Sequence, residues 1–537
     1  MVQSIPGIYL SERGDAHELH FCTPLMKEGI QKGDLKEQVS LARIQLENNT
    51  SRRNFLKTTV ASAAVAQAPS LARAANRRPN IVLIMADDVS PDYYSCYGST
   101  VTNTPNIDAI ADAGVMFRTC WASALCSPAR ACITTGRYAH RTGFYSNGLS
   151  RPQTDGSNDL LRHHHSFAWF LKQAGYATAI AGKWHLGSGA PYGKVGGFDE
   201  YCLWEGLREI EHLPGSPTFT GQFEDDTKQT TSRYWHPAVV QNDKLLDTKE
   251  NDFGPDIYTD FICDFMERNR DKPFLAYYPM AAPHGSRKGH TTTPLRGKPG
   301  DMSKASAKEE EQKFAALNEY IDVLVGRIHN KVKDLGLADN TIIMFCSDNG
   351  TAVTAKSRGV ERGCRVPFVV AGAGIKRRGV TDEITDFADF LPTLAELAGV
   401  KIPADYEVDG TSLTGFLRGE TDRHRDWILS YIGGTRLVRT KRHLLEAVNP
   451  ILDMPEGRLY DCGNNRDGKG YRLIIDRDSI PKVQRMVDDI LAKHPSLQED
   501  ESWLQNPAGQ RFLKECKSKA FREKHLNNHP DYEYTLK

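Results

Sequence analysis

The segment NIVLIMADD, residues 80–88, is a run of apolar, largely aliphatic residues that ends in two aspartates. A continuous apolar run between polar residues is typical of a strand that is buried on both faces, as in a parallel sheet. We therefore predict a strand over residues 80–86. Asp87 and Asp88 would then lie at its carboxyl end.

Further apolar segments alternate with segments of helical periodicity along the chain. Strands are expected at residues 176–180, 274–278, 341–346 and 366–370, and helices at 104–114, 126–136, 163–174, 256–269, 306–335 and 387–397. This alternation predicts an α/β fold, with a large, mostly parallel sheet flanked by helices. Residues 202–253 show no clear period, so we interpret them as inserted loops that shape a substrate pocket.

Beyond about residue 420 the pattern changes to short β-rich pieces followed by one helical segment. The pieces are 427–431, 435–440, 443–446 and 458–460, and the helix is expected at 482–493. We predict a smaller C-terminal α+β subdomain with an antiparallel sheet over residues 421–537. The catalytic domain would then occupy residues 76–420.

The N-terminal part of the chain has the features of an export signal. Arg52-Arg53 precede Phe55-Leu56 and a run of small apolar residues, and Leu71-Ala72-Arg73-Ala74 offers a cleavage site. This pattern resembles a twin-arginine signal over residues 51–75, and residues 1–50 would be an extension or a start assigned too far upstream. The apolar run is shorter than the roughly 20 residues of a membrane span. We expect a periplasmic or secreted protein that uses the twin-arginine export machinery.

Composition excludes several classes of partner and site. Lys and Arg together number 68, as do Asp and Glu, so no overall basic field attracts nucleic acid or anionic lipid. Eleven cysteines spread over 537 residues do not form a disulfide framework, and no CxxC pair indicates a zinc site. Any preference for an anionic ligand must therefore come from charged residues at the binding site itself.

Polar residues follow four of the predicted strands. They are Asp87-Asp88, Lys183 with His185, His284, and Asp348-Asn349. Ligands of parallel sheets bind at the carboxyl ends of the strands, so these residues should converge on one site. Taken alone, Asp87-Asp88 would be a helix cap or turn, Asp348-Asn349 a turn, and His284 a structural histidine. Together, the oxygen donors Asp87, Asp88, Asp348 and Asn349 favour Ca²⁺, or Mg²⁺ as second choice, over zinc.

The segment Cys126-Ser127-Pro128-Ala129-Arg130 begins one of the predicted helices. Proline is favoured in a first helical turn, because its missing N–H is unpaired there anyway. Residue 126 would therefore lie at a helix N-terminus, where free N–H groups favour an anion. The plain alternative is a buried cysteine ahead of a short helix.

This segment resembles the sulfatase signature Cys-x-Pro-x-Arg, and Thr135-Gly136-Arg137-Tyr138 continues it. Residues 175–187 are similar to the second signature of that family, and Pro283-His284, Asp348-Asn349-Gly350, Lys356 and residues 361–367 follow in family order. The resemblance spans about residues 78–400, and Leu459-Tyr460-Asp461 looks like part of the family's second domain. One departure is Glu361-Arg362-Gly363, where the family usually has Glu-Gly-Gly.

The resemblance implies a sulfuric ester hydrolase of the alkaline phosphatase superfamily. Cys126 would be oxidised by a maturation enzyme to formylglycine, whose hydrate attacks the sulfur of a sulfated small molecule or glycan. Asp87, Asp88, Asp348 and Asn349 would bind Ca²⁺ together with residue 126, and Arg130 would hold the nucleophile. Lys183, His185, His284 and Lys356 would grip the sulfate or serve as acid and base.

Two alternatives remain open at this point. One is a phosphoesterase of the same superfamily, in which the nucleophile is usually Thr or Ser. The other is a secreted metal-binding or glycan-binding protein with an inert Cys126. We also expect Lys183 to be partly exposed, so that its replacement affects the chemical step more than stability.

Overall fold

The computed structural model describes most of the chain after residue 77. The described residues are 78–147, 149–150, 160–187, 196–205, 223–224, 230–286, 289–295, 297, 305–352, 355–450, 454–466 and 470–499, with single residues between 505 and 518. The predicted extension at 1–50 and the predicted signal at 51–75 lie outside them. Arg77–Lys537 forms one compact unit, and it contains both sheets described below. No helix among the described residues has the length and apolar character needed to cross a membrane.

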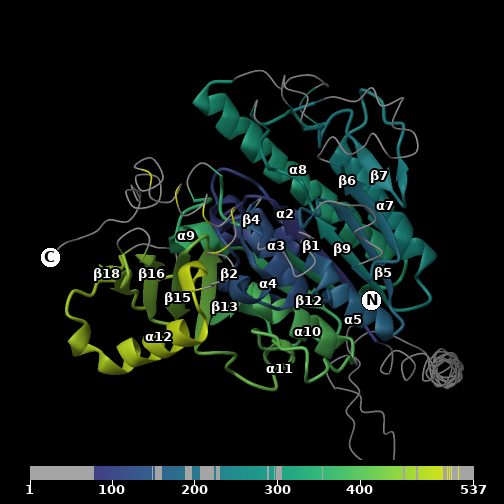
Figure 1. The fold of residues 1–537 in the computed structure, drawn as a ribbon. Helices are drawn as coiled ribbons and strands as arrows, with labels where there is room; N and C mark the ends of the chain where they lie inside the picture. Colours follow the sequence, from purple (N-terminus) through teal and green to yellow (C-terminus); the bar gives the residue numbers. More distant parts are fainter. Residues whose placement is uncertain are drawn as a thin grey trace, which may run out of the picture. The chain divides into compact units, whose positions relative to one another are not determined.

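The centre of this unit is a sheet of 11 strands among the described residues (Figure 1). The strands are β1 (Asn80–Ala86), β2 (Val115–Trp121), β5 (Ala177–Gly182), β6 (Glu200–Trp204), β7 (Val239–Gln241), β8 (Lys244–Leu245), β9 (Phe274–Pro279), β10 (Thr341–Ser347), β11 (Arg365–Val366), β12 (Phe368–Gly372) and β13 (Gly379–Asp386). Their order is β11-β2-β12-β10-β1-β9-β5-β6-β7-β8, and β13 pairs with β2.

The sheet is parallel through its middle. Strands β10, β1, β9, β5 and β6 pair in parallel, and in this register Ile81 lies between Ile342 and Leu275. The neighbours on both sides, β12 and β7, run antiparallel. The predicted α/β class is therefore confirmed, but the sheet is mixed and its parallel part is concentrated in the five central strands.

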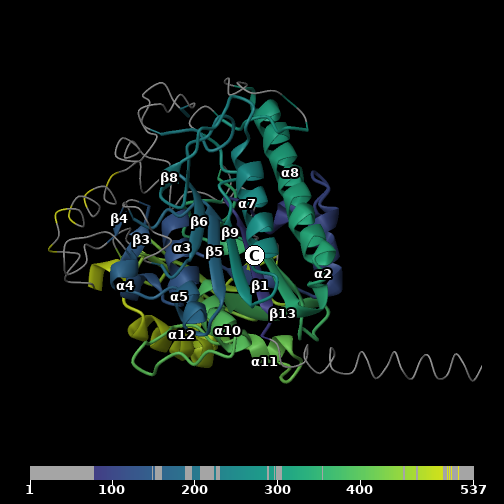
Figure 2. The ribbon, with the colours of Figure 1, turned by 90° about the vertical axis from the view of Figure 1, so that its right-hand side faces the viewer.

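Strand β1 shows why the NIVLIMA segment has no polar alternation. Ile81, Leu83 and Met85 belong to one hydrophobic core, and Val82 and Ile84 belong to a second. The first core contains residues of α3 (Cys126–Thr135), α5 (Phe167–Gln173) and α10 (Phe390–Leu397), and the second those of α2 (Pro105–Ala113), α7 (Gly254–Arg268) and α8 (Ala307–Asp334). Figure 2 shows α7 and α8 on one side of the central strands and α3 and α5 on the other. Because both faces are covered, every β1 residue is buried.

Several predicted boundaries were wrong. Residues 202–253, interpreted as loops, contain β7, β8 and most of β6. Helix α5 begins at Phe167 and not at residue 163, because Ser166 caps it by accepting from the Trp169 N–H. Strands β2 and β13 were not predicted. Half of β13 is solvent-facing and polar, so it carries no apolar run.

Short elements complete the region: β3 (Phe144–Ser146), β4 (Leu149–Ser150), α4 (Ala139–Thr142), α9 (Glu361–Cys364) and α11 (Thr414–Leu417).

A second sheet of five antiparallel strands follows, as predicted. It consists of β14 (Trp427–Ile432), β15 (Thr435–Thr440), β16 (His443–Val448), β17 (Arg458–Asp461) and β18 (Arg472–Leu473), with α12 (Pro481–Lys493) after it. A third hydrophobic core joins the two sheets, with Trp121 and Ile384 on one side and Ile428 and Leu437 on the other. The Ser430 hydroxyl also donates to the Ala122 carbonyl at 2.7 Å.

A buried ion pair fastens the second sheet to the loop region of the first. Arg439 of β15 lies with its Nε 3.0 Å from Glu361 Oε1 of α9, and neither side chain is more than 2% exposed. The Tyr471 hydroxyl donates to the other Glu361 oxygen at 2.6 Å. Removal of one partner leaves a buried charge uncompensated, which makes such a pair costly to break.

We therefore expect Arg439→Met to lower the free energy of unfolding by about 3–5 kcal/mol, because Glu361 would remain buried without its cation. Urea denaturation followed by circular dichroism measures this change. The matched control is Arg442→Met, because Arg442 is 63% exposed and Asp461 would keep its contact with Arg472, so the urea midpoint should change little. Equal midpoints for the two variants would show that the Glu361–Arg439 pair does not stabilise the fold.

Candidate active site

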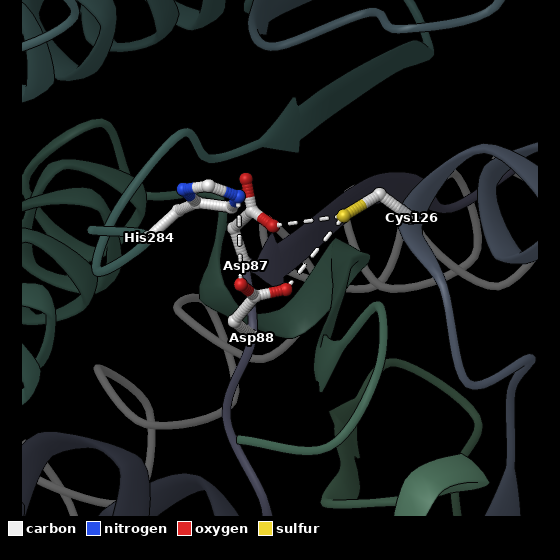
Figure 3. A group of neighbouring side chains, drawn as sticks. All are labelled: Asp87, Asp88, Cys126 and His284. Carbon is white, nitrogen blue, oxygen red and sulfur yellow. Dashed lines mark hydrogen bonds and ion pairs between the residues drawn. The ribbon is translucent and has the colours of Figure 1, made fainter. Parts of the chain in front are cut away.

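The polar segments after β10, β1, β9 and β5 lie side by side, because these four strands are neighbours in the sheet. They bring Asp348, Asp87, His284 and Lys183 to one edge. Cys126, the first residue of α3, faces the same edge. Figure 3 shows Cys126 and His284 pointing toward the two aspartates that follow β1. The sequence prediction that these residues converge agrees with this geometry.

Cys126 lies against both aspartates and is fully buried. Its Sγ lies 3.5 Å from Asp87 Oδ1 and 3.6 Å from Asp88 Oδ1, with the thiol as donor. Burial, and then the charge of Asp348, raises the pKa of the Cys126 thiol well above its usual value. The thiol therefore remains protonated at neutral pH. A protonated thiol is a poor nucleophile, so unmodified Cys126 is unsuited to attack a substrate.

Arg130 ties α3 to the strand ends. Its Nε and Nη2 donate to Asp348 Oδ2 at 3.0 and 2.8 Å, and its Nη1 donates to the Lys183 carbonyl at 2.7 Å. The second Asp348 oxygen accepts from the Asp88 N–H at 3.0 Å. Burial disfavours the charged guanidinium, but Asp348 and Asp87 outweigh this effect and raise the pKa of Arg130. Arg130 is thus a charged residue with no exposed surface to offer solvent.

Lys183 is buried, which corrects the expectation that it is partly exposed. Its Nζ lies 2.6 Å from Asp87 Oδ2, and its side chain is 4% exposed. Burial alone would raise the pKa of Asp87, but Lys183 and the other nearby cations lower it well below its usual value. Replacing Lys183 would leave the Asp87 charge poorly compensated. Such a change affects stability as well as chemistry.

His284 and Lys356 form a second pair in the site. The His284 Nδ1 donates to the Gly285 carbonyl at 2.6 Å, since a carbonyl can only accept. The other nitrogen, Nε2, is therefore free to accept from Lys356 Nζ at 3.2 Å. Burial and the nearby Arg233 lower the pKa of His284 well below its usual value, consistent with a neutral ring. Lys356 Nζ also lies 2.7 Å from the Asp88 carboxylate.

His185 is held in place by Ser127, a residue whose role the sequence did not indicate. The Ser127 hydroxyl donates to the His185 carbonyl at 3.0 Å and lies 3.3 Å from His185 Nδ1. With the hydroxyl proton engaged, Nδ1 is the donor of that second contact, and Nε2 carries the lone pair. Surrounding protein and the cations Lys183 and Arg130 lower the pKa of His185 well below its usual value, although its ring still reaches solvent.

Backbone conformation is unusual at three positions of this site. Asp88, His185 and Ser357, next to Lys356, all have positive φ, at 67°, 62° and 65°. Non-glycine residues rarely adopt this left-handed region, and those that do are concentrated at functional sites.

The oxygen donors of the site, Asp87, Asp88, Asp348 and Asn349, fit a hard divalent cation. Ligand atoms of Asp87, Asp88, Cys126 and His284 lie within 4.8 Å of one another. Asp348 and Asn349 join them through hydrogen bonds to Asp88. Asn349 Oδ1 is buried and has no hydrogen-bond partner, as expected of an oxygen that serves a cation. Burial and the Asp87 charge also raise the pKa of Asp348, although the charge of Arg130 opposes this effect.

Arg233 is a further residue near the site that sequence reasoning missed. It is buried, pairs with Glu224 through Nε and Nη2, and stacks 4.1 Å over the Trp204 ring. Its Nη1 is buried without a hydrogen-bond partner. No motif in the sequence marks Arg233, because its role depends on a contact with Glu224 within an irregular segment.

The departure from the family pattern at Arg362 is accommodated by an ion pair. Arg362 Nη2 lies 3.2 Å from Asp92 Oδ2. Gly363 is the position that cannot carry a side chain, because a Cβ there would lie 2.6 Å from the Arg358 carbonyl oxygen. The loop therefore keeps the glycine that its packing requires.

Comparisons with known proteins agree with this geometry. The sequence model of the sulfatase family matches residues 79–400. The chain is 28% identical to N-acetylglucosamine-6-O-sulfatase of Bacteroides thetaiotaomicron, covering 67% of this chain and 75% of that protein. It is 31% identical to N-acetylgalactosamine-6-sulfatase of Sus scrofa, covering 75% of this chain and 79% of that protein.

Solved structures share the fold. The crystal structure of Ps i-CgsB aligns with a TM-score of 0.62 at 24% identity, over 82% of this chain and 98% of that one. A protein solved in complex with its substrate D-glucosamine-2-N,6-O-disulfate aligns with a TM-score of 0.57 at 22% identity, over 80% of this chain and 99% of that one. The family match covers more than half of the chain and includes the site residues from Asp87 to Lys356. The chain therefore belongs to the sulfatase family of sulfuric ester hydrolases and has the α/β fold of the alkaline phosphatase superfamily.

Proposed function

We propose that this sulfatase hydrolyses a carbohydrate sulfate, using a formylglycine made from Cys126 and a bound Ca²⁺ ion, with Mg²⁺ as second choice. The observation that carries the proposal is the place of Cys126, between two aspartates in a site with an unpartnered amide oxygen. The names of the related N-acetylhexosamine sulfatases support a sugar substrate. These names favour a sulfated sugar over the other sulfated small molecules, which the sequence alone did not distinguish.

When present, the formylglycine hydrate supplies a hydroxyl nucleophile and the cation acts as Lewis acid and template. Asp87, Asp88, Asp348 and Asn349 would hold the cation together with residue 126. The site has three carboxylates, Asp87, Asp88 and Asp348, and three cations, Arg130, Lys183 and Lys356, so its own charges sum to zero. A divalent cation makes the site positive, which suits a sulfate ester anion.

The remaining side chains position and protonate the substrate. Lys183 and Lys356 place ammonium groups beside Asp87 and Asp88, where a bound sulfate would meet them. The His284–Lys356 contact gives a path for a proton toward the leaving oxygen, because Lys356 donates to His284 Nε2. Since His185 Nδ1 is engaged with Ser127, its unprotonated Nε2 would serve as the base that takes a proton from residue 126.

The phosphoesterase alternative requires a hydroxyl nucleophile at the same place. The thiol of Cys126 has a raised pKa and no hydroxyl neighbour in its contacts with Asp87 and Asp88. Oxidation to formylglycine resolves this, since its hydrate carries hydroxyl groups. An unmodified thiol at residue 126 has no hydroxyl group that could act as this nucleophile.

We further propose that the twin-arginine segment at 51–75 exports the protein to the periplasm or beyond. The pattern Arg52-Arg53 followed by Phe55-Leu56 supports this route. A route that carries folded proteins also allows the metal site to assemble before export.

Formylglycine at residue 126 is tested by mass spectrometry of the peptide that contains Cys126. Protein produced together with a formylglycine-generating enzyme should show CH₂SH replaced by CHO and should hydrolyse sulfated N-acetylhexosamines. Cys126→Ala, which cannot be oxidised, should be inactive at unchanged thermal stability. A fully active preparation that carries only the thiol would overturn the proposal.

The cation is tested by its removal and return. Dialysis against EDTA should abolish sulfate release, because the site would lose its Lewis acid and the net positive charge that suits a sulfate anion, and Ca²⁺ should restore it, with Mg²⁺ second. Elemental analysis before and after dialysis gives the stoichiometry. Recovery with Zn²⁺ but with neither Ca²⁺ nor Mg²⁺ would show that the oxygen ligand set is wrong.

His185→Asn separates chemistry from folding. Asn tolerates positive φ and the His185 ring reaches solvent, so the melting temperature should hold while kcat falls about 10²–10⁴-fold with the loss of the base. The contrast is Lys183→Met, which should lower both kcat and the melting temperature, because Asp87 would stay buried without its closest cation. Unchanged turnover in His185→Asn would remove His185 from the mechanism.

A further inference from the structure

A second group of metal-ligating side chains lies outside the site described above. It consists of His140 in α4, Asp409 in the loop before α11, and His494 at the end of α12. One ring nitrogen of each histidine and one Asp409 oxygen lie within 4.8 Å of one another. We propose that this group is a binding site for a transition metal ion, with zinc as the ion that its ligands suit best.

The choice of zinc follows from the donors. Two imidazole nitrogens and one carboxylate oxygen are typical ligands of zinc, whereas calcium and magnesium prefer oxygen alone. Donors of one tetrahedral zinc are separated by about 3.4 Å, given ligand distances of about 2.0–2.2 Å, so rotations of these side chains bring them to one ion. Three protein ligands leave a fourth position for water. The three residues are each partly exposed, so water reaches the group.

This group is separate from the candidate active site. Helix α3 begins at Cys126 and ends at Thr135, ahead of α4. Its ten residues span about 15 Å, so His140 lies beyond the opposite end of the helix from the nucleophile. The donor sets also differ, because the active site has only oxygen donors among the proposed ligand side chains.

The ligands already have the supporting contacts that orient metal-binding side chains. Asp409 Oδ2 accepts from the Tyr138 N–H at 2.7 Å, and Oδ1 accepts from Arg141 Nε at 2.8 Å. His140 Nδ1 lies 3.4 Å from the Tyr431 hydroxyl. Metal-bound histidines usually use their second nitrogen in this way, which fixes the orientation of the ring.

His494 provides an independent observation. Its Nδ1 is buried and has no hydrogen-bond partner, although buried ring nitrogens are nearly always paired. Its backbone is fixed, since its N–H donates to the Ile490 carbonyl at 3.1 Å and its carbonyl accepts from Arg436 at 2.8 Å. The ordinary explanation is that the ring only packs against Tyr138 and Trp427, with centroids 5.4 and 5.5 Å away. Packing alone leaves Nδ1 unpaired, whereas a metal accounts for it.

A metal here would connect the two parts of the chain. His140 and Asp409 belong to the region around the large sheet, and His494 ends the helix that follows the small sheet. The ion would fasten α12 to α4, as structural zinc fastens elements in other proteins. The site has no part in sulfate ester cleavage, so its test does not depend on the proposed function.

The experiment uses the full purified chain, first treated with chelator and then saturated with Ca²⁺ so that the active site is filled. Zinc chloride is added, unbound metal is removed by desalting, and bound zinc is measured by mass spectrometry. We expect about one zinc per chain, and a loss of about 10–100-fold in zinc affinity for His494→Gln and for His140→Gln. Cobalt(II) in place of zinc should give visible absorption bands that both variants lack.

The matched control is His329→Gln in α8, which should bind zinc as the unchanged chain does. The melting temperature of the unchanged chain should rise with zinc, and that of His494→Gln should not. Absence of retained zinc in the unchanged, folded chain would overturn the proposal. Equal zinc binding by both His494→Gln and His140→Gln would overturn it too, because the ion would then lie elsewhere.

Discussion

The pair between Arg130 and Asp348 is the interaction on which the rest of the site depends. The guanidinium has no exposed surface, so it must be compensated inside the protein, and Asp348 does this through two contacts to one oxygen. The other Asp348 oxygen accepts from the Asp88 N–H, and the same guanidinium donates to the Lys183 carbonyl. One buried charge therefore sets the positions of α3, β1, β5 and β10 relative to each other. The position of Cys126, four residues before Arg130, follows from it.

Much of the fold and the site was predictable because the signals are local. The strands β1, β5, β9 and β10 were located to within about two residues. A strand that is buried on both faces is a continuous apolar run, which can be recognised without knowing its neighbours in the sheet. The capping box of Ser306 and Glu309 marks the start of α8 in the same local way. The polar residues that follow these strands were predicted to lie together, because parallel strands end at the same edge of the sheet.

What the sequence did not reveal depends on contacts between distant segments. Strand β2 pairs in parallel with β13, more than 260 residues further along the chain, whereas β11 and β12 pair with β2 antiparallel, and nothing in the composition of these strands indicates their direction. The burial of Lys183 follows from Asp87, 96 residues earlier. Ser127 acquires a role only because His185 folds back onto it. The group of His140, Asp409 and His494 likewise comes from three separate segments, so the spacing of these residues in the sequence does not indicate it.

The burial of α3 has a consequence for the order of events during synthesis. All ten of its residues are buried, so an enzyme that modifies Cys126 would have no access to this side chain in the folded protein. Asp348, whose charge holds Arg130 in place, is 218 residues further along the chain. At about 5–20 residues per second, the ribosome needs roughly 10–40 s to reach it. Under the function proposed above, oxidation of Cys126 would therefore have to take place within this time, while the 126–130 segment is still accessible in the nascent chain.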